Sequence, residues 1–233
     1  MNAISTMFEN SAFAASMLSV SAYGIGIWLK RKTGSSIANP LLVSLVIVIV
    51  FLLLTGIDYE SYKRGCCIFS YLLTPATVAL AVPLYEQRQE LRRNYRAVMT
   101  GIAAGTMASL ISILTMALAL GLSHTAYVSL LPKSITMPIG ISMAAELGGF
   151  VPVTVVCIVI TGVLGNVVAE KLFRMIHLEE PIAKGIATGT ASHVIGTAKA
   201  MEMGEVEGAM SSLSIIVAGL MTVVGASVFS LFL

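Results

Sequence analysis

Six stretches of this chain run for 20 residues or more without an Asp, Glu, Lys or Arg. A helix needs about 20 mostly apolar residues to cross the hydrocarbon core of a bilayer, so each stretch predicts a membrane-spanning helix. The six stretches are Asn10–Leu29, Thr33–Ile57, Gly65–Tyr85, Ala97–Pro132, Leu147–Ala169 and Gly208–Leu233. The chain is therefore predicted to be an all-α integral membrane protein.

Composition supports this class and excludes others. Only 11% of the 233 residues are charged and 57% are hydrophobic, whereas an ordinary soluble domain is about 25% charged. A net charge of +2 argues against a nucleic-acid-binding protein. A single membrane domain over residues 1–233 is expected. The cysteines Cys66, Cys67 and Cys157 form no CxxC or Cys/His cluster. We therefore expect them to be packing residues that bind neither a metal nor a cofactor. No GxSxG, HExxH, GxxxxGK[ST] or GxGxxG motif favours an enzyme.

Two further apolar stretches are interrupted. Ser134–Ala145 is charge-free for only 12 residues, is bracketed by Lys133 and Glu146, and contains a proline, which favours a re-entrant element. Gly185–Met201 has the length of a short span but contains a histidine and a lysine. With the six runs, these stretches predict a helical bundle of about eight membrane segments.

The positive-inside rule orients these segments. If the cations after Leu29, Tyr85 and Ala169 are cytoplasmic, the N-terminus is outside and residues 125–147 are re-entrant. If 125–147 crossed fully instead, the cations after Ala169 would be outside. In the favoured topology Gly185–Met201 crosses outward, the glutamates at 202, 205 and 207 are outside, and the C-terminus is cytoplasmic.

This topology predicts an inverted repeat, because the block from 41 to 120 and the block from 150 to 232 run in opposite directions. Thr74–Glu86 aligns weakly with Thr190–Glu202, and the sequence from Pro75 aligns equally weakly with that from Pro132. Which relation reflects a duplication stays open. Paired interrupted segments in two halves are a pointer to the binding site of a secondary transporter.

Three interrupted segments supply the candidate substrate-binding residues. They combine helix breakers, hydroxyl groups and intramembrane charge, and unwound helix ends attract anions. The candidates are Thr74, Pro75, Ala76, Thr77, Pro132, Lys133, Ser134, Thr136, Thr190, Ser192, His193, Gly196 and Thr197. The sequence predicts that Pro75 opens the third helix over Thr74–Thr77.

Each candidate also has a purely structural interpretation. Pro75 could only kink its helix, and Lys133 could extend to water at the membrane surface. Lys199 and Glu202 could form an i,i+3 pair, and His193 could be a buried structural histidine or a proton carrier. The GxxxG segments Gly101–Gly105 and Gly185–Gly189 predict close helix packing.

Four motifs in order, NPLL from Asn39, LTPATVALAVPLYEQ from 73, LPKSITMP from 131 and GTASHVIGTAKAME from 189, resemble the LrgB/CidB family of bacterial membrane proteins. The resemblance runs from NPLL to the last span. It implies a multi-pass protein of the bacterial cytoplasmic membrane, related to the transport half of plastid glycolate/glycerate exchangers. It also implies an antiholin-like or autolysis-modulating role beside a small LrgA/CidA-type membrane protein.

Two functions follow as hypotheses. The broken-helix pattern favours a secondary transporter, and the resemblance implies that its substrates are small monocarboxylates of the glycolate, glycerate, pyruvate or lactate class. The alternative is an antiholin-like or holin-like protein that modulates murein hydrolase export and autolysis with an LrgA/CidA-type partner, in which oligomers form or block a membrane lesion. The expected partners are a monocarboxylate anion, the lipid bilayer, that small membrane protein and further copies of the chain.

Overall fold

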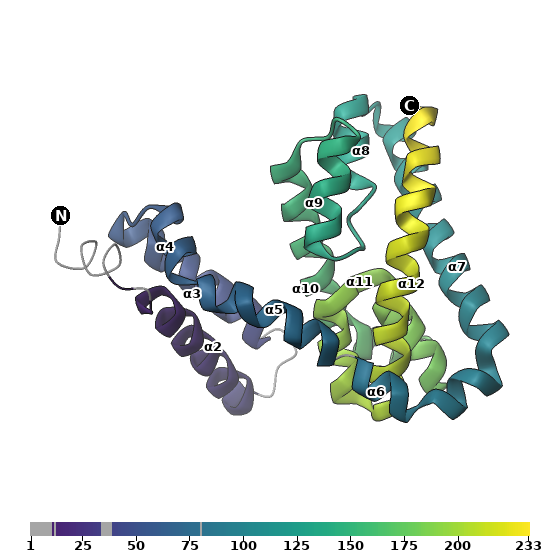
Figure 1. The fold of residues 1–233 in the computed structure, drawn as a ribbon, viewed down its shortest axis with the longest axis horizontal. Helices are drawn as coiled ribbons and strands as arrows, with labels where there is room; N and C mark the ends of the chain where they lie inside the picture. Colours follow the sequence, from purple (N-terminus) through teal and green to yellow (C-terminus); the bar gives the residue numbers. More distant parts are fainter. Residues whose placement is uncertain (1–10, 12, 34–38, 80) are drawn as a thin grey trace. The chain divides into compact units, whose positions relative to one another are not determined.

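The computed structural model describes residues 11, 13–33, 39–79 and 81–233, and within these ranges every regular element is a helix (Figure 1). The all-α prediction is confirmed for this part of the chain. The helices form two compact units, residues 1–79 and residues 80–233.

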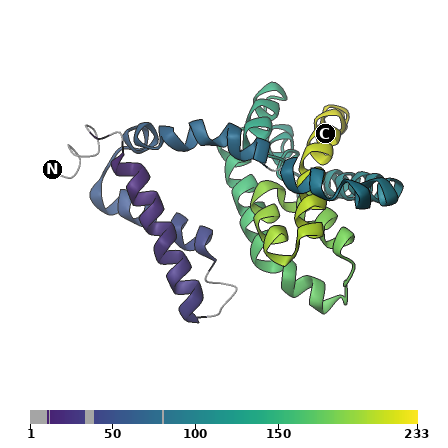
Figure 2. The ribbon, with the colours of Figure 1, turned by 60° about the horizontal axis from the view of Figure 1, so that its bottom comes forward.

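The described part of the N-terminal unit contains four helices: α2 (Ala14–Thr33), α3 (Pro40–Thr55), α4 (Tyr59–Gly65) and α5 (Cys67–Ala79). The helices α2 and α3 lie side by side (Figure 2). The Asn39 side chain accepts hydrogen bonds from the N–H groups of Leu41 and Leu42, and Pro40 begins the helix, so the NPLL motif is a helix start. With 16 residues, α3 is apolar but shorter than the predicted span Thr33–Ile57.

The predicted opening at Pro75 is wrong. The helix α5 continues through Pro75 and ends at Ala79, and α6 (Ala81–Glu86) follows in the C-terminal unit. A proline removes one backbone hydrogen bond, and here the helix continues for four residues beyond it. The side chains of Thr74 and Thr77 lie outside the part that the structure describes.

Three long helices dominate the C-terminal unit: α7 (Arg88–Leu120), α10 (Val151–Met175) and α12 (Glu205–Phe229), which a short 3-10 turn (Ser230–Phe232) extends. All three are long and apolar enough to cross a membrane. They also expose large apolar side chains such as Met116, Leu164 and Val224. Such exposure is unfavourable in water and expected in contact with lipid. The chain is thus a membrane protein with several apolar helices.

Residues 124–146 form the first of two helical hairpins in this unit. Its arms are α8 (His124–Leu130) and α9 (Met137–Glu146), and neither is long enough to cross about 30 Å of hydrocarbon. The Tyr127 hydroxyl donates a hydrogen bond to the carbonyl of Phe229 near the end of α12. The Ser129 hydroxyl accepts a hydrogen bond from the N–H of Phe150, just before α10. The hairpin therefore enters and leaves at one end of the unit, as the re-entrant prediction requires. This end, which also holds the last residue of α7 and the C-terminus, is called the upper end (Figure 1).

The second hairpin is α11 (Pro181–Met203), which was predicted to cross the membrane and does not. Its backbone leaves helical geometry at Ser192 (φ −132°, ψ 16°) and His193 (φ 42°, ψ −141°). Beyond this break the chain turns back along itself. The evidence is that Gly196 lies beside Thr188, eight residues earlier, where an added Cβ would be 3.0 Å from the Thr188 carbonyl oxygen. The two arms, 181–191 and 194–203, are each about 15 Å long and too short to span.

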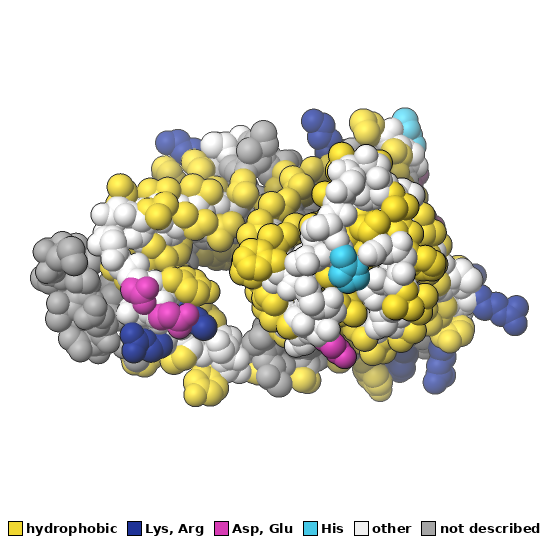
Figure 3. Space-filling model, turned by 90° about the horizontal axis from the view of Figure 1, so that it is seen from above, with side chains coloured by type: hydrophobic (Ala, Val, Ile, Leu, Met, Phe, Trp, Pro, Cys, Tyr) yellow, Lys and Arg dark blue, Asp and Glu magenta, His cyan; other side chains and the backbone are white. Residues whose placement is uncertain are grey.

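This reversal corrects the predicted topology. Glu202 and Glu207 surround the same hollow as Arg174 and Lys184, so they lie at the lower end of the unit, with the predicted cytoplasmic cations. Helix α12 then rises from this end, and the C-terminal Leu233 meets His124 at the upper end (2.9 Å from its carbonyl oxygen to Nδ1). The positive-inside rule now predicts that the C-terminus faces away from the cytoplasm. The upper end shows mainly hydrophobic and uncharged side chains around one histidine (Figure 3).

Candidate functional site

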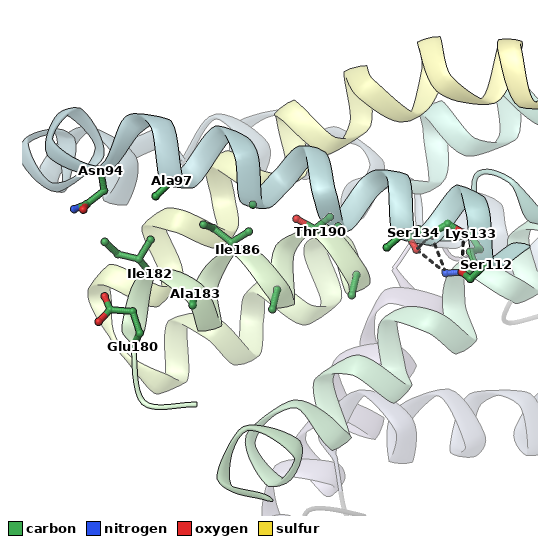
Figure 4. A pocket seen from close by; sticks show the side chains of 16 residues that line it. Asn94, Ala97, Ser112, Lys133, Ser134, Glu180, Ile182, Ala183, Ile186 and Thr190 are labelled. Atoms are coloured by element: carbon green, nitrogen blue, oxygen red, sulfur yellow. Dashed lines mark hydrogen bonds between the residues drawn. The ribbon is translucent and has the colours of Figure 1, made fainter. Parts of the chain in front are cut away.

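A cavity of about 900 Å³ lies within the C-terminal unit, along one side of α7. Its other walls are the first arm of α11 and the loop between α8 and α9 (Figure 4). Most of the wall is apolar, formed by alanines, glycines and isoleucines. The polar side chains in the wall are those of Asn94, Ser109, Ser112, Lys133, Ser134, Glu180 and Thr190.

Lys133 and two serines form the end of the cavity nearest the first hairpin. The Lys133 ammonium donates to Ser134 Oγ at 2.9 Å and to Ser109 Oγ at 3.3 Å. The two serine oxygens lie 3.5 Å apart. Among the described residues, no carboxylate lies within ion-pairing distance of Lys133. The described side chains around the Lys133 ammonium group therefore supply hydrogen-bond acceptors but no compensating negative charge.

The position of Lys133 argues against the snorkelling interpretation. Its contact Ser109 precedes the end of α7 at Leu120 by 11 residues, or about 16 Å of helix. This depth is about half the thickness of the hydrocarbon core. Lys133 therefore points toward the middle of the unit, where an intramembrane charge is a functional candidate.

Thr190 places the second hairpin beside the same cavity. It packs against α7, where a Cβ on Gly105 would lie 2.9 Å from Thr190 Cγ2. Its buried hydroxyl has no hydrogen-bond partner among the described residues, and such an orphan group costs about 1–3 kcal/mol. Gly105 and Ser109 are one turn apart on α7, so the ends of both hairpins meet the same short segment of this helix.

The break at the tip of the second hairpin is held by α10. The His193 Nε2 lies 3.0 Å from the carbonyl oxygen of Ile158, and Asn166 donates to the carbonyl of Ile195 at 2.6 Å. Thr197 donates to the carbonyl of His193 at 2.9 Å, and its hydroxyl lies 2.7 Å from Ser211 Oγ of α12. These hydrogen bonds tie the tip of the second hairpin to α10 and α12. Ser192 and His193 are buried and do not line the cavity.

Glycines make room for this tip. A Cβ on Gly165 would collide with the Ser192 side chain, and one on Gly162 would lie 2.7 Å from the His193 ring. The predicted GxxxG contacts are confirmed as well. Gly185 and Gly189 meet the backbone of α12, at Glu207 and Ser211 respectively.

The predicted Lys199–Glu202 pair is confirmed at 3.2 Å. Lys199 also contacts Glu170 of α10 at 2.8 Å, and Glu170 pairs in turn with Arg174. These residues tie the returning arm of the second hairpin to α10 at the lower end. Among the described ion pairs, Lys199–Glu170 is the one that joins two helices.

The structure brings together some of the predicted site residues. Lys133, Ser134 and Thr190 line the cavity, while Pro132 and Thr136 shape the turn that carries Lys133. Gly196 and Thr197 stabilise the reversal of α11, and Pro75 and Ala76 lie in α5 of the N-terminal unit.

Sequence reasoning missed Ser109, Ser112 and Asn166. All three are uncharged polar residues inside charge-free runs. Ser109 and Ser112 are three residues apart and share one helix face, a pattern that could have indicated a polar stripe within the predicted span.

Comparison with known proteins identifies the relatives of this chain. The model of the LrgB-like family matches residues 19–232. The chain is 34% identical over 220 residues to a Bacillus subtilis protein named antiholin-like protein LrgB, with 94% of this chain and 95% of that protein covered. The chain belongs to the LrgB-like family. Proteins of the same name from Bacillus cereus and Bacillus anthracis are 35% identical to it over 218 residues, covering 93% of this chain and 95% of each. No solved structure matches.

The LrgB-like match includes the N-terminal unit from residue 19 and nearly all of the C-terminal unit, so both hairpins and the cavity fall inside the family region. The family motifs have distinct structural places. LPKSITMP forms the tip of the first hairpin, and GTASHVIGTAKAME forms the tip and returning arm of the second. The resemblance stated on these motifs is confirmed.

Proposed function

We propose that this chain is a secondary transporter of small monocarboxylate anions, of the glycolate, glycerate, pyruvate or lactate class, in the cytoplasmic membrane of a bacterium. The observation that carries the proposal is the meeting of two hairpins at one cavity. The first reaches Ser109 from the upper end through Lys133, and the second reaches Gly105 from the lower end through Thr190. Interrupted helices that meet near the bilayer midplane are the usual setting of a transporter's substrate site.

An inverted repeat accounts for this arrangement. The hairpin α8–α9 followed by α10, and the hairpin α11 followed by α12, have the same order of parts. They run in opposite directions, since α10 descends to the lower end and α12 rises from it. This division differs from both weak sequence alignments, and it pairs the turn at 131–136 with the break at 192–193. Two such halves allow one site to be exposed alternately to each side.

The names of the relatives favour a second function. Three relatives are named antiholin-like protein LrgB, which supports an antiholin-like role for this chain. In that case the chain works with a small LrgA/CidA-type membrane protein, or with further copies of itself, to control a membrane lesion. The two functions are compatible if solute transport is the activity through which the antiholin-like effect arises. Neither function requires an enzymatic reaction.

Reconstitution into sealed liposomes separates the two functions. The transporter is expected to exchange labelled lactate or glycolate with saturation and with competition by unlabelled anion, while the vesicles retain a larger trapped dye. Protein-free liposomes provide the baseline. Dye loss at the same protein density, with no saturable uptake of any of the four anions, would contradict the transporter proposal and support a lesion-forming protein.

A further inference from the structure

We infer that Lys133, with the hydroxyl groups of Ser109 and Ser134, binds the carboxylate of the substrate, and that this one positive charge restricts the site to monoanions. The inference rests on the proposed transport function and adds the residues and the charge that select the substrate. Its basis is the cluster at the end of the cavity nearest the first hairpin, where the Lys133 ammonium group has hydroxyl partners and no described carboxylate partner.

The charge of Lys133 has no compensating carboxylate among the described residues. A charge inside a membrane protein is costly unless an opposite charge compensates it. Lys199 illustrates the usual solution, since it pairs with two glutamates. Lys133 contacts hydroxyl oxygens instead, which stabilise the ammonium group without neutralising it. A bound monocarboxylate neutralises the Lys133 end of the cavity, whereas a dicarboxylate would leave one negative charge there and an amide would leave the positive charge. Glu180 also lines the cavity, but its side chain is exposed at the opposite end.

The cluster of Lys133, Ser109 and Ser134 has hydrogen-bond donors to spare. An ammonium group has three N–H donors, and the serines receive two of them. One donor therefore remains for an anion. The serine oxygens accept from Lys133, so a hydroxyl proton of this pair is also free to point to a carboxylate oxygen. Three groups from α7 and the first hairpin thus converge where one carboxylate could lie.

The shape of the cavity limits the rest of the substrate. The walls beyond the lysine are small and apolar, with Ala108 and Ala187 among them, and the carboxylate of Glu180 lies toward the opposite end (Figure 4). A second carboxylate on the substrate would meet apolar wall or approach a like charge. The cavity therefore suits an anion with a short, weakly polar remainder.

Binding to purified protein tests the inference. Labelled lactate is displaced by lactate, malonate and lactamide, which carry one, two and no negative charges near neutral pH. We expect wild-type protein to bind lactate at least about 10-fold more tightly than malonate or lactamide, because only lactate balances the single charge of the half-buried Lys133. Equal displacement by all three compounds would overturn the inference without any substitution.

Variants of the cluster give an independent readout. Lys133→Met is expected to weaken lactate binding by roughly 30-fold or more, since truncation of one partner of a buried charged pair has effects of this order. Lys133→Arg keeps the charge and should retain most of the affinity, and Lys171→Met, at an exposed cation outside the cavity, should bind as wild type. If Lys133→Met does not fold, Ser109→Ala combined with Ser134→Ala should weaken binding about 10-fold. Folded Lys133→Met that binds lactate as tightly as wild type would overturn the inference. Absence of saturable exchange by wild-type protein would instead overturn the proposed function.

Discussion

Gly165→Leu is expected to abolish accumulation of the folded protein, because no space exists for a side chain at this position. The tip of the second hairpin packs directly on Gly165, and an added Cβ would overlap both Cβ and Oγ of Ser192. Neither atom is the end of a long flexible side chain, so α10 and α11 would have to separate. Even Gly165→Ala should lower stability by about 1–3 kcal/mol, the usual range for overpacking.

Two controls make this prediction specific. Gly24→Leu places the same side chain on a helical glycine with no heavy atom within 4 Å of the added Cβ, so it should leave yield and thermal stability nearly unchanged. Ser192→Gly removes the two colliding atoms and should restore much of the stability lost in Gly165→Ala. The yield of folded protein and its melting temperature in detergent compare all these variants with wild type. Gly165→Leu protein as stable as Gly24→Leu protein would mean that the tip of α11 does not pack on α10.

Two substitutions of His193 should separate the contribution of its hydrogen bond to stability from the cost of its strained backbone. His193→Ala removes the contact with the Ile158 carbonyl from a buried position and is expected to lower stability by about 2–4 kcal/mol. The φ angle of 42° at His193 is unfavourable for alanine and acceptable for glycine. His193→Gly should therefore be more stable than His193→Ala by about 1 kcal/mol, although still less stable than wild type.

His177 provides the matched control. It also has a positive φ, 55°, but its side chain is exposed. Glycine there should match or exceed wild-type stability, and alanine should have a small effect. If His193→Ala were as stable as wild type, His193 would not fasten the hairpin, and its interpretation as a proton carrier would regain support. Lactate uptake at several pH values would then compare wild type with His193→Gln.

Charge-free runs predicted the long helices of the C-terminal unit well. The runs Ala97–Pro132, Leu147–Ala169 and Gly208–Leu233 contain most of α7, α10 and α12. Length and exclusion of charge are sufficient here, since a spanning helix needs little else. The short apolar run between Lys133 and Glu146 likewise indicated a re-entrant element, and the structure has a hairpin there.

The reversal of α11 could not be read in the same way. Its polar residues indicated an interruption, but the direction of the chain after an interruption depends on two backbone conformations, those of Ser192 and His193. Those conformations are stabilised by Gly162, Gly165 and Asn166 of α10, which are distant in sequence. Without these contacts, Gly185–Met201 has the length of a short span, and the predicted side of Glu202 and of the C-terminus followed from that length.

The candidate site was predicted only in part for a related reason. Lys133, Ser134 and Thr190 stand out in apolar sequence because charge and hydroxyl groups are unusual there. Ser109 does not, because a single serine in a spanning helix usually bonds to its own backbone. Only the approach of the first hairpin to α7 shows that Ser109 faces a lysine.

Substrate protection of a cysteine in the cavity tests the central claim, that a small anion occupies the space between the two hairpins. Ala187 lines the cavity and is exposed, so Ala187→Cys can be introduced after Cys66, Cys67 and Cys157 are replaced by alanine. A bulky charged thiol reagent should stop lactate exchange by this variant, and saturating lactate should slow the modification about 10-fold or more. The same reagent on Lys171→Cys should neither stop exchange nor respond to lactate. Complete modification at position 187 that lactate does not slow and that leaves exchange at its original rate would contradict the account.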